Sequence, residues 1–541
     1  MSAAGYHLVH QVDDDDRGDG IELDTLGTPR RCFSRAEPEY LGRIPSAPWL
    51  IPFFFANGLA FGISAVPRLN LVVSMICQHV LEQDASQPKV VVGGENPQCS
   101  NADVSSATAL FVSGGNAISA VLAATMCAVL GRLSDRVGRV KIMAVNTCGI
   151  LSSDLVLIML AKWPGSFDYR WLLLAFILDG LSGSFGLDIA MGSSYISDCA
   201  GESSRTVLIG RIHGTLSIGA AVGPLISSFL VTVGGNKHPL LPYYAALATR
   251  LMSIAYLRFI PESLPRVIYP HRFSGENAQS DRLNHGNTLR DKLRRFNPRA
   301  WLNRIVPPST TNARLVKINV GILLFVNILI FACLVGISEV LILYPQVKFN
   351  WGNVENNLFI AIINGFTAMA STIFLPVLVR LFRKQGFEHK PRVNTTAQGG
   401  PDVPRTGADI LDRVIIQTSM LFDVVGFIGF ATSPNGVLFT LSGALTSFWA
   451  VGLATTQATL TKHVTPERTG EMMGGLFLIQ SLVRIIAQPA VNWVYSVTVK
   501  TMAEVSFLGV STVLCAGLIV TVFLRTDVFD ELAASRSFRG G

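Results

Sequence analysis

Long apolar stretches separated by short polar segments recur along the whole chain of 541 residues. A helix that rises about 1.5 Å per residue needs about 20 apolar residues to cross a hydrocarbon core about 30 Å thick. Twelve stretches approach that length, so the pattern predicts an all-α membrane protein with twelve transmembrane helices. The predicted spans are 48–75, 105–130, 142–162, 171–197, 207–230, 242–260, 315–343, 354–381, 412–432, 436–460, 472–498 and 503–524.

A long polar segment divides the predicted helices six and six. It is rich in Arg, as is typical of a cytosolic linker between two membrane bundles. Within it, Leu289, Leu293 and Phe296 recur at helical spacing, which predicts either an amphipathic helix on anionic lipid or a solvated basic loop. The predicted domains are a disordered cytosolic tail (1–45), an N-terminal six-helix bundle (46–260), the linker (261–314), a C-terminal six-helix bundle (315–525) and a cytosolic C-terminal tail (526–541).

Composition and charge agree with a protein of the lipid bilayer. Hydrophobic residues make up 49% of the chain and charged residues only 15%, whereas a soluble protein carries about a quarter charged residues. The basic residues do not form one patch with interleaved aromatic residues, so nucleic acid is not a predicted partner. Lys and Arg concentrate in alternate loops, which predicts cytosolic termini. We expect a monomer in the plasma membrane rather than the vacuolar membrane.

Histidine and cysteine positions give little support to a metal centre or a membrane enzyme. The nine His are scattered and no Cys/His pair has the spacing of metal ligands, so no metal, cofactor or catalytic residue is predicted. Cys77 and Cys99 fall near the outer end of the first helix and in the following loop. An oxidising compartment would permit a disulfide there.

One predicted inner loop carries the motif GRLSDRVGRVK, between the second and third helices. Its glycines permit a tight turn, its cations anchor the loop inside, and Asp135 can accept from Arg139 or face a helix N-terminus. The motif resembles the signature loop of the major facilitator superfamily, and this resemblance implies a conformational latch. The latch residues are Gly131, Asp135, Arg136, Gly138 and Arg139.

The fifth predicted helix contains GAAVGPLISS, with Gly219, Gly223 and Pro224. It resembles a motif that is typical of proton-coupled antiporters in the same superfamily. The alternative is an ordinary packing face, because small residues let two helices approach closely.

A closer resemblance covers most of the first, fourth and fifth helices. The segment 179–206 and the sequence PRLNLVVSMIC from Pro67 resemble the proton-coupled folate transporter family and its fungal relatives. Tetracycline-type drug/proton antiporters look similar in the same region. The resemblance therefore implies proton-coupled transport and leaves the substrate open.

Ionisable residues inside predicted helices are the candidates for mechanism, because an unpaired charge at the bilayer centre costs about 2.5–3.5 kcal/mol. Asp179 and Asp188 are nine residues apart on the fourth helix, half a turn out of phase on a straight helix. One of the two carboxylates should line the transport path, and the other should lie at a contact between helices. Intervening glycines can bend the helix and weaken this argument.

Three further helices contribute candidates to the substrate or proton pathway. Gln480, Arg484 and Gln488 recur at every fourth residue, and Arg484 offers a contact for an anion. Glu339 on the seventh helix and Arg68 on the first are candidates for a gate pair or a proton site.

Four other ionisable residues have a structural alternative. His213 titrates near neutral pH when unperturbed, although a lone His is more often structural. Asp154, Arg250 and Asp423 fall on the third, sixth and ninth helices. The resemblance to the superfamily implies that these helices form an outer scaffold, where internal ion pairs are expected rather than a role in transport.

Two aromatic residues can flank a substrate or pack in the core. These are Tyr195 and Trp449.

These features favour a secondary active transporter that moves a small organic solute by alternating access and is coupled to protons. Symport and antiport both remain open. The alternative function is a non-transporting nutrient sensor of the same fold.

Overall fold

The computed structural model describes residues 45–81, 89–164, 166–199, 202–263, 313–378, 408–464 and 469–526. These residues form helices and short connections, and no strand occurs among them. Almost all of the two predicted tails, and the part of the linker with the candidate amphipathic helix, lie outside the described residues.

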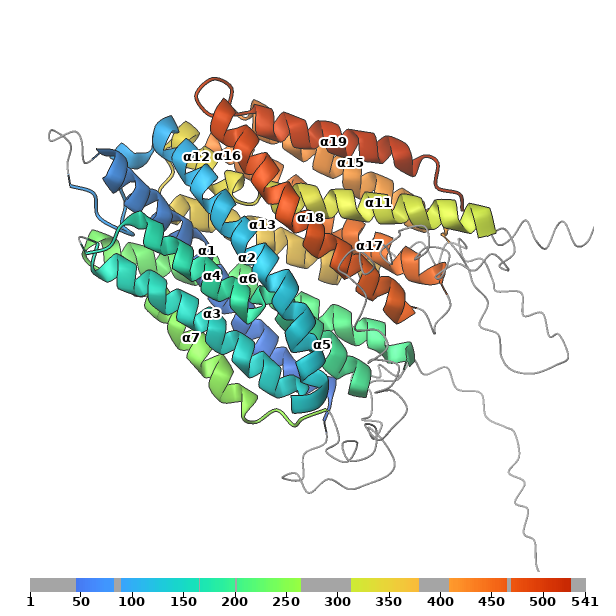
Figure 1. The fold of residues 1–541 in the computed structure, drawn as a ribbon. Helices are drawn as coiled ribbons and strands as arrows, with labels where there is room; N and C mark the ends of the chain where they lie inside the picture. The colour runs from blue at the N-terminus through green and yellow to red at the C-terminus, as the bar shows by residue number, and fades with distance from the viewer. Residues whose placement is uncertain are drawn as a thin grey trace, which may run out of the picture.

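The helices form two groups that follow the order of the chain (Figure 1). The N-terminal half, drawn blue to green, contains α1 (Leu50–Leu81), α2 (Ala102–Val137), α3 (Arg139–Lys162), α4 (Leu172–Ser182), α5 (Ser184–Cys199), α6 (Glu202–Gly234) and α7 (Leu241–Leu257). The C-terminal half, drawn yellow to red, contains α11 (Ala313–Ile337), α12 (Val340–Phe349), α13 (Asn353–Met369) with the π-helical turn η6 (Ala370–Phe374), α15 (Ile410–Thr432), α16 (Gly436–Thr446), α17 (Trp449–Lys462), α18 (Thr469–Thr498) and α19 (Val505–Thr521).

The prediction of an all-α membrane protein built from two helical bundles is confirmed. Nine helical segments of the described chain are long and apolar enough to cross a membrane. The helices α7, α18 and α19 pack beside them, against α1, α2 and α15, and the arrangement is consistent with twelve crossings. Large apolar side chains such as Phe229 and Met252 project from the surface, 66% and 72% exposed, as lipid-facing side chains do.

Three predicted spans are interrupted helices. In the span 171–197, α4 ends and α5 begins where Gly183 (φ 98°) and Ser184 (φ 53°) both adopt positive φ. The span 315–343 is likewise divided between α11 and α12, and the span 436–460 between α16 and α17. Interrupted helices are typical of substrate and ion sites in transporters, because they leave backbone polar groups free inside the bundle.

Glycines bring α1 and α6 into close contact. A Cβ added at Gly223 would lie 2.6 Å from the backbone nitrogen of Ile63, and one at Gly62 would lie 2.9 Å from the carbonyl oxygen of Ala220. Gly219 faces the α1 backbone in the same way. The fifth-helix motif is therefore a packing face in this structure, as one of the two interpretations expected.

A disulfide identifies one end of the bundle. It joins Cys77 to Cys99, with their Cα atoms 5.6 Å apart. We call this the disulfide end, and we call the opposite end, where the turn between α2 and α3 lies, the latch end.

The two halves meet where α2 packs on α18 and α6 packs on α13. At the disulfide end, polar contacts fasten α2 to α18 and to the turn that follows α18. The pairs are Asp103–Lys500, Ser105–Tyr495 (3.0 Å between the hydroxyl oxygens) and Ser106–Ser496 (2.8 Å from Oγ to the carbonyl oxygen). This conformation is therefore closed between α2 and α18 at the disulfide end.

Candidate functional site

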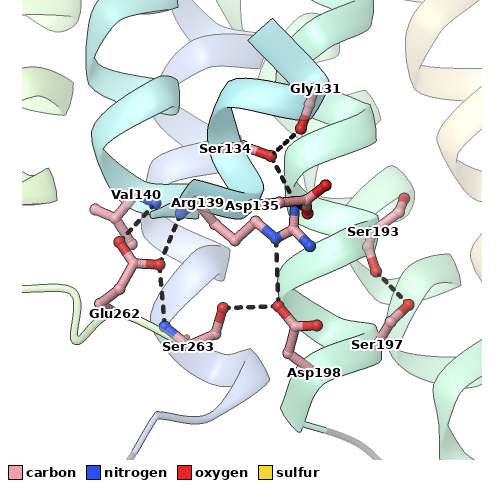
Figure 2. A network of polar contacts seen from close by, with 10 residues as sticks. All are labelled: Gly131, Ser134, Asp135, Arg139, Val140, Ser193, Ser197, Asp198, Glu262 and Ser263. Carbon is pink, nitrogen blue, oxygen red and sulfur yellow. Dashed lines mark hydrogen bonds and ion pairs between the residues drawn. The ribbon is translucent and has the colours of Figure 1, made fainter. Parts of the chain in front are cut away.

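The predicted latch forms a network around one arginine (Figure 2). The Arg139 guanidinium lies 2.6 Å from Asp135 Oδ1 and 3.3 Å from Asp198 Oδ2, and it donates to Ser134 Oγ at 2.5 Å. The hydroxyl of Ser263 donates to the same Asp198 oxygen at 3.0 Å. The prediction that Asp135 accepts from Arg139 is confirmed, and these contacts stay within the N-terminal half.

Glu262 joins the network of the predicted latch, and the sequence interpretation missed it. Its two carboxylate oxygens accept from the backbone N–H groups of Arg139 and Val140 at 2.7 and 3.2 Å. They thus satisfy free N–H groups at the N-terminus of α3, where the helix dipole favours an anion. Gly138 (φ 114°) leaves room for this carboxylate, and Arg136 lies in the last turn of α2.

A second cluster of candidate residues lies where the two halves meet. Glu339, at the break between α11 and α12, accepts from the side-chain amides of Asn116 on α2 and Gln488 on α18, both at 3.4 Å. Arg484 lies one turn before Gln488 on α18. Arg68 on α1 lies against the ring of Phe176, and that ring packs beside Gly115, the neighbour of Asn116 on α2. Both cations therefore lie near this carboxylate. We call Glu339, Asn116, Gln488, Arg68 and Arg484 the central charge cluster. It contains two cations and one anion from both halves.

Neither arginine of the central charge cluster forms a hydrogen bond or ion pair with any residue that the structure describes. Arg68 follows Pro67, and its guanidinium lies 5.1 Å from the ring centroid of Phe176 in a cation–π contact. Arg484 is exposed, whereas Gln480 and Gln488, one turn away on either side, are buried. Both guanidinium groups thus keep their hydrogen-bond donors available.

Gln480 belongs to a different network from Arg484 and Gln488, although the three recur at every fourth residue. Its side-chain amide donates to Asn327 Oδ1 at 2.8 Å, and Asn327 Nδ2 donates to Thr456 Oγ1 at 2.8 Å. These contacts join α18, α11 and α17 within the C-terminal half. Gln480 thus packs helices together, whereas Gln488 contacts the central charge cluster.

The two candidate aspartates of the fourth span have different surroundings. Asp179 accepts from Ser119 Oγ at 2.8 Å and joins α4 to α2. Asp188 lies beyond the break, on α5, and is 1% exposed. Within the described residues, neither of its carboxylate oxygens has a hydrogen-bond partner. The straight-helix argument does not apply, because the chain changes direction between the two positions.

An internal ion pair is confirmed for two of the scaffold residues. Arg250 Nε on α7 lies 2.5 Å from Asp154 Oδ2 on α3, and both side chains are buried. Asp423 on α15 has no ion-pair partner in the part of the chain that the structure describes. Its side chain is buried, and its Oδ1 has no hydrogen-bond partner among the described residues.

His213 and Tyr195 lie away from the central charge cluster. His213 is partly buried on α6. The next residue is Gly214, and a Cβ added at Gly214 would lie 3.4 Å from Thr372 of η6. The buried Tyr195 donates its hydroxyl to the carbonyl oxygen of Pro261 at 2.8 Å. Tyr195 therefore packs in the core, next to the start of the predicted linker.

A family model supplies the identity of the fold. The model of the Major Facilitator Superfamily matches residues 97–397, more than half of the chain. The chain belongs to this superfamily. Its relatives include the MFS-type transporter avaJ of Aspergillus versicolor, which is 25% identical over 475 residues that cover 86% of each chain.

Two solved major facilitator structures share the fold. The human organic anion transporter MFSD10 superposes with a TM-score of 0.55 at 16% identity, covering 88% of this chain and 100% of that one. A D-xylose–proton symporter superposes with a TM-score of 0.54 at 15% identity, covering 88% of this chain and 96% of that one. At these identities the likeness shows the major facilitator fold alone.

Members of the major facilitator superfamily are transporters, not enzymes. Among the described residues, no group of three or more His, Cys, Asp or Glu side chains could hold a metal ion.

A counterpart of the latch exists in the C-terminal half of this major facilitator chain, with its charges reversed. Lys462, at the end of α17, lies 2.9 Å from Asp409 Oδ2 and 2.6 Å from Asp412 Oδ2, at the start of α15. In the N-terminal half the cation, Arg139, begins α3, and the anion, Asp198, lies near the end of α5. The network of the predicted latch joins α3 to α5, and its counterpart joins α15 to α17.

Proposed function

We propose that this chain is a secondary active transporter that moves a small organic solute by alternating access and is coupled to protons. The central charge cluster carries the proposal. Arg68 and Asn116 belong to one half, whereas Glu339, Arg484 and Gln488 belong to the other. A change in the charge of Glu339 therefore changes the attraction between the halves.

The position of this carboxylate supports proton coupling. An ionised Glu339 attracts Arg68 across the interface between the halves, and a protonated Glu339 loses that attraction. A proton thus biases the equilibrium between two arrangements of the halves by its differential interaction with them. Asp188, buried without a hydrogen-bond partner among the described residues, is a second proton site. One structural neighbour is a D-xylose–proton symporter, which supports proton coupling in this fold.

Alternating access uses the two ends of the bundle in turn. Contacts between α2 and α18 close the disulfide end here, and we propose that they break when that end opens. A disulfide needs an oxidising compartment, which supports a disulfide end that faces away from the cytosol and a cytosolic latch end. We propose the plasma membrane as the location. The concentration of Lys and Arg in the alternate, latch-end loops supports the same orientation.

Flux in proteoliposomes tests the proposal. The purified chain is reconstituted and screened with folates, drugs, sugars and organic acids under an imposed pH gradient. We expect Glu339→Gln to keep solute exchange without a gradient and to lose accumulation driven by the gradient, because a neutral amide cannot carry a proton. Asp168→Asn, at an exposed site, is the matched control.

Two outcomes would contradict the proposal in different ways. Full gradient-driven accumulation in Glu339→Gln, Asp179→Asn and Asp188→Asn would exclude these carboxylates as the coupling groups. Binding of a solute with no flux at any pH would instead favour the nutrient sensor.

A further inference from the structure

The central charge cluster is unbalanced. Arg68 and Arg484 carry two positive charges near the Glu339 carboxylate. Arg484 lies one turn from Gln488, whose amide contacts Glu339, and Arg68 stacks on Phe176, which packs beside Gly115 and hence next to Asn116, the other amide that contacts Glu339. A net cation inside a membrane protein is costly without a counter-ion, so a second anion would stabilise the cluster. The solute is the available source of that anion when the site is occupied.

The hydrogen-bond donors of the cluster are also unused. Each guanidinium presents five N–H donors in a planar fork that matches the two oxygens of a carboxylate or the oxygens of a sulfonate. Within the described chain neither arginine donates a hydrogen bond to a protein acceptor. The ring of Phe176 lies against the Arg68 guanidinium and limits its orientation while leaving its N–H edges free.

The internal carboxylate is held loosely. Its contacts with Asn116 and Gln488 are both 3.4 Å long, beyond the 2.7–3.2 Å of a good N–H···O hydrogen bond. An incoming anion can therefore compete with Glu339 for the arginines without breaking a strong bond.

We infer that Arg68 and Arg484 form an oxyanion subsite, and that the transported solute is an organic anion bearing a carboxylate or sulfonate. This inference rests on the proposed function. The solute's anionic group bridges α1 of one half and α18 of the other. It takes over the role of counter-ion that Glu339 has when the site is empty. Bridging draws the halves together around the solute, so binding and closure are linked.

Equilibrium binding to the purified full-length chain in detergent tests the subsite without any flux. The probes are acids paired with their uncharged amides, namely benzoate with benzamide, nicotinate with nicotinamide and succinate with succinamide. We expect saturable thermal stabilisation by one or more of the acids and none by the matching amides. Arg68→Gln and Arg484→Gln should each weaken acid binding about tenfold or more, as expected for a charge-assisted hydrogen bond.

Three further variants sharpen the test. Arg484→Lys keeps the charge but loses the planar fork, so its affinity should lie between wild type and Arg484→Gln. Glu339→Gln removes the competing carboxylate and should bind the same acid more tightly. Arg170→Gln, at an exposed site near the disulfide end, should leave binding unchanged.

The inference is overturned if none of the acids binds, if an amide binds as well as its acid, or if both arginine variants bind the acid like wild type. Its failure is distinct from failure of the proposed function. Gradient-driven flux of a neutral or cationic solute that survives both arginine substitutions would retain the transporter and remove the anion subsite. Acid binding that requires both arginines, without any flux, would retain the anion subsite and remove the transporter function.

Discussion

A buried histidine just beyond the end of α17 has the surroundings of a neutral imidazole. His463 is 1% exposed; its Nδ1 lies 2.8 Å from the carbonyl oxygen of Thr459, and its Nε2 lies 3.4 Å from the side-chain amide of Asn319. Nδ1 therefore donates and Nε2 accepts, which is the pattern of a ring with one proton. Burial lowers the pKa of His463 below its usual value, although the Thr459 carbonyl opposes this shift.

This histidine predicts a loss of stability on mild acidification. The unfolded chain, with an ordinary pKa of about 6.5, takes up a proton more readily than the folded one. The stabilisation is fully present above that value and is lost as the pH falls through the lower folded pKa. We expect His463→Gln to flatten the dependence of the thermal unfolding midpoint on pH between about 7.5 and 5.5, whereas the exposed His238→Gln keeps the wild-type slope. Parallel profiles for wild type and His463→Gln would refute this.

At the residue scale, the sequence identified the charges but could not assign their partners. Arg68, Glu339 and Arg484 stand out because they interrupt apolar helices. Their meeting depends on how α1, α11 and α18 pack, which no local pattern encodes. Glu262 was missed because it follows a helix in a polar segment, where a carboxylate is unremarkable.

At the scale of helices, the α1–α6 contact predicts a steric response. Gly223→Ala places a methyl group against the backbone at Ile63, so the two helices must separate. We expect a loss of about 1–3 kcal/mol in stability, as for other overpacked sites. Gly210→Ala lies on the same helix with nothing within 4 Å and should cost nothing. Thermal unfolding in detergent measures both, and equal effects of the two substitutions would show that the contact is not tight.

The charge-reversed latch of the C-terminal half yields a second prediction for helices. Lys462→Met leaves Asp412, whose side chain is only 13% exposed, without its cation. We expect a loss of about 1–3 kcal/mol, because a partly buried charge then lacks its partner. Lys462→Arg keeps the positive charge and should retain most of the stability. A neutral outcome for Lys462→Met in thermal unfolding would mean that solvent screens this pair.

Helix positions followed from apolar length, whereas helix interruptions did not. The apolar runs across Gly183 and across Glu339 continue on both sides, so the sequence predicts single spans. The interruption at Gly183 depends on two successive residues with positive φ, one of which is Ser184. A serine in this conformation is uncommon and is held by its surroundings, so propensity does not reveal it.

At the scale of the whole molecule, the contacts between the halves define which end is closed. The pair Asp103–Lys500 is solvent-exposed, so it contributes at most about 1 kcal/mol by itself. The two halves are otherwise joined near it by hydroxyl contacts between α2 and α18. Weak, replaceable contacts of this kind suit an interface that must open and close during transport, because neither state is then strongly favoured.

Reversing one charge of that pair should open the disulfide end. Lys500→Glu places two carboxylates together and disfavours the closed arrangement by about 1 kcal/mol, or about fivefold in population. The reporter is Asn116→Cys, at the contact between α2 and Glu339, in a background that keeps the Cys77–Cys99 disulfide and replaces the other cysteines by Ser.

A membrane-impermeant maleimide applied to each side of sealed vesicles reads the change. Labelling from the disulfide end should accelerate and labelling from the latch end should slow, because opening one end of an alternating-access transporter closes the other. Lys237→Glu, an exposed substitution at the same end, controls for a general effect of added negative charge. Faster labelling from both ends would indicate loosening of the fold, and unchanged labelling would mean that this ion pair does not hold the halves together.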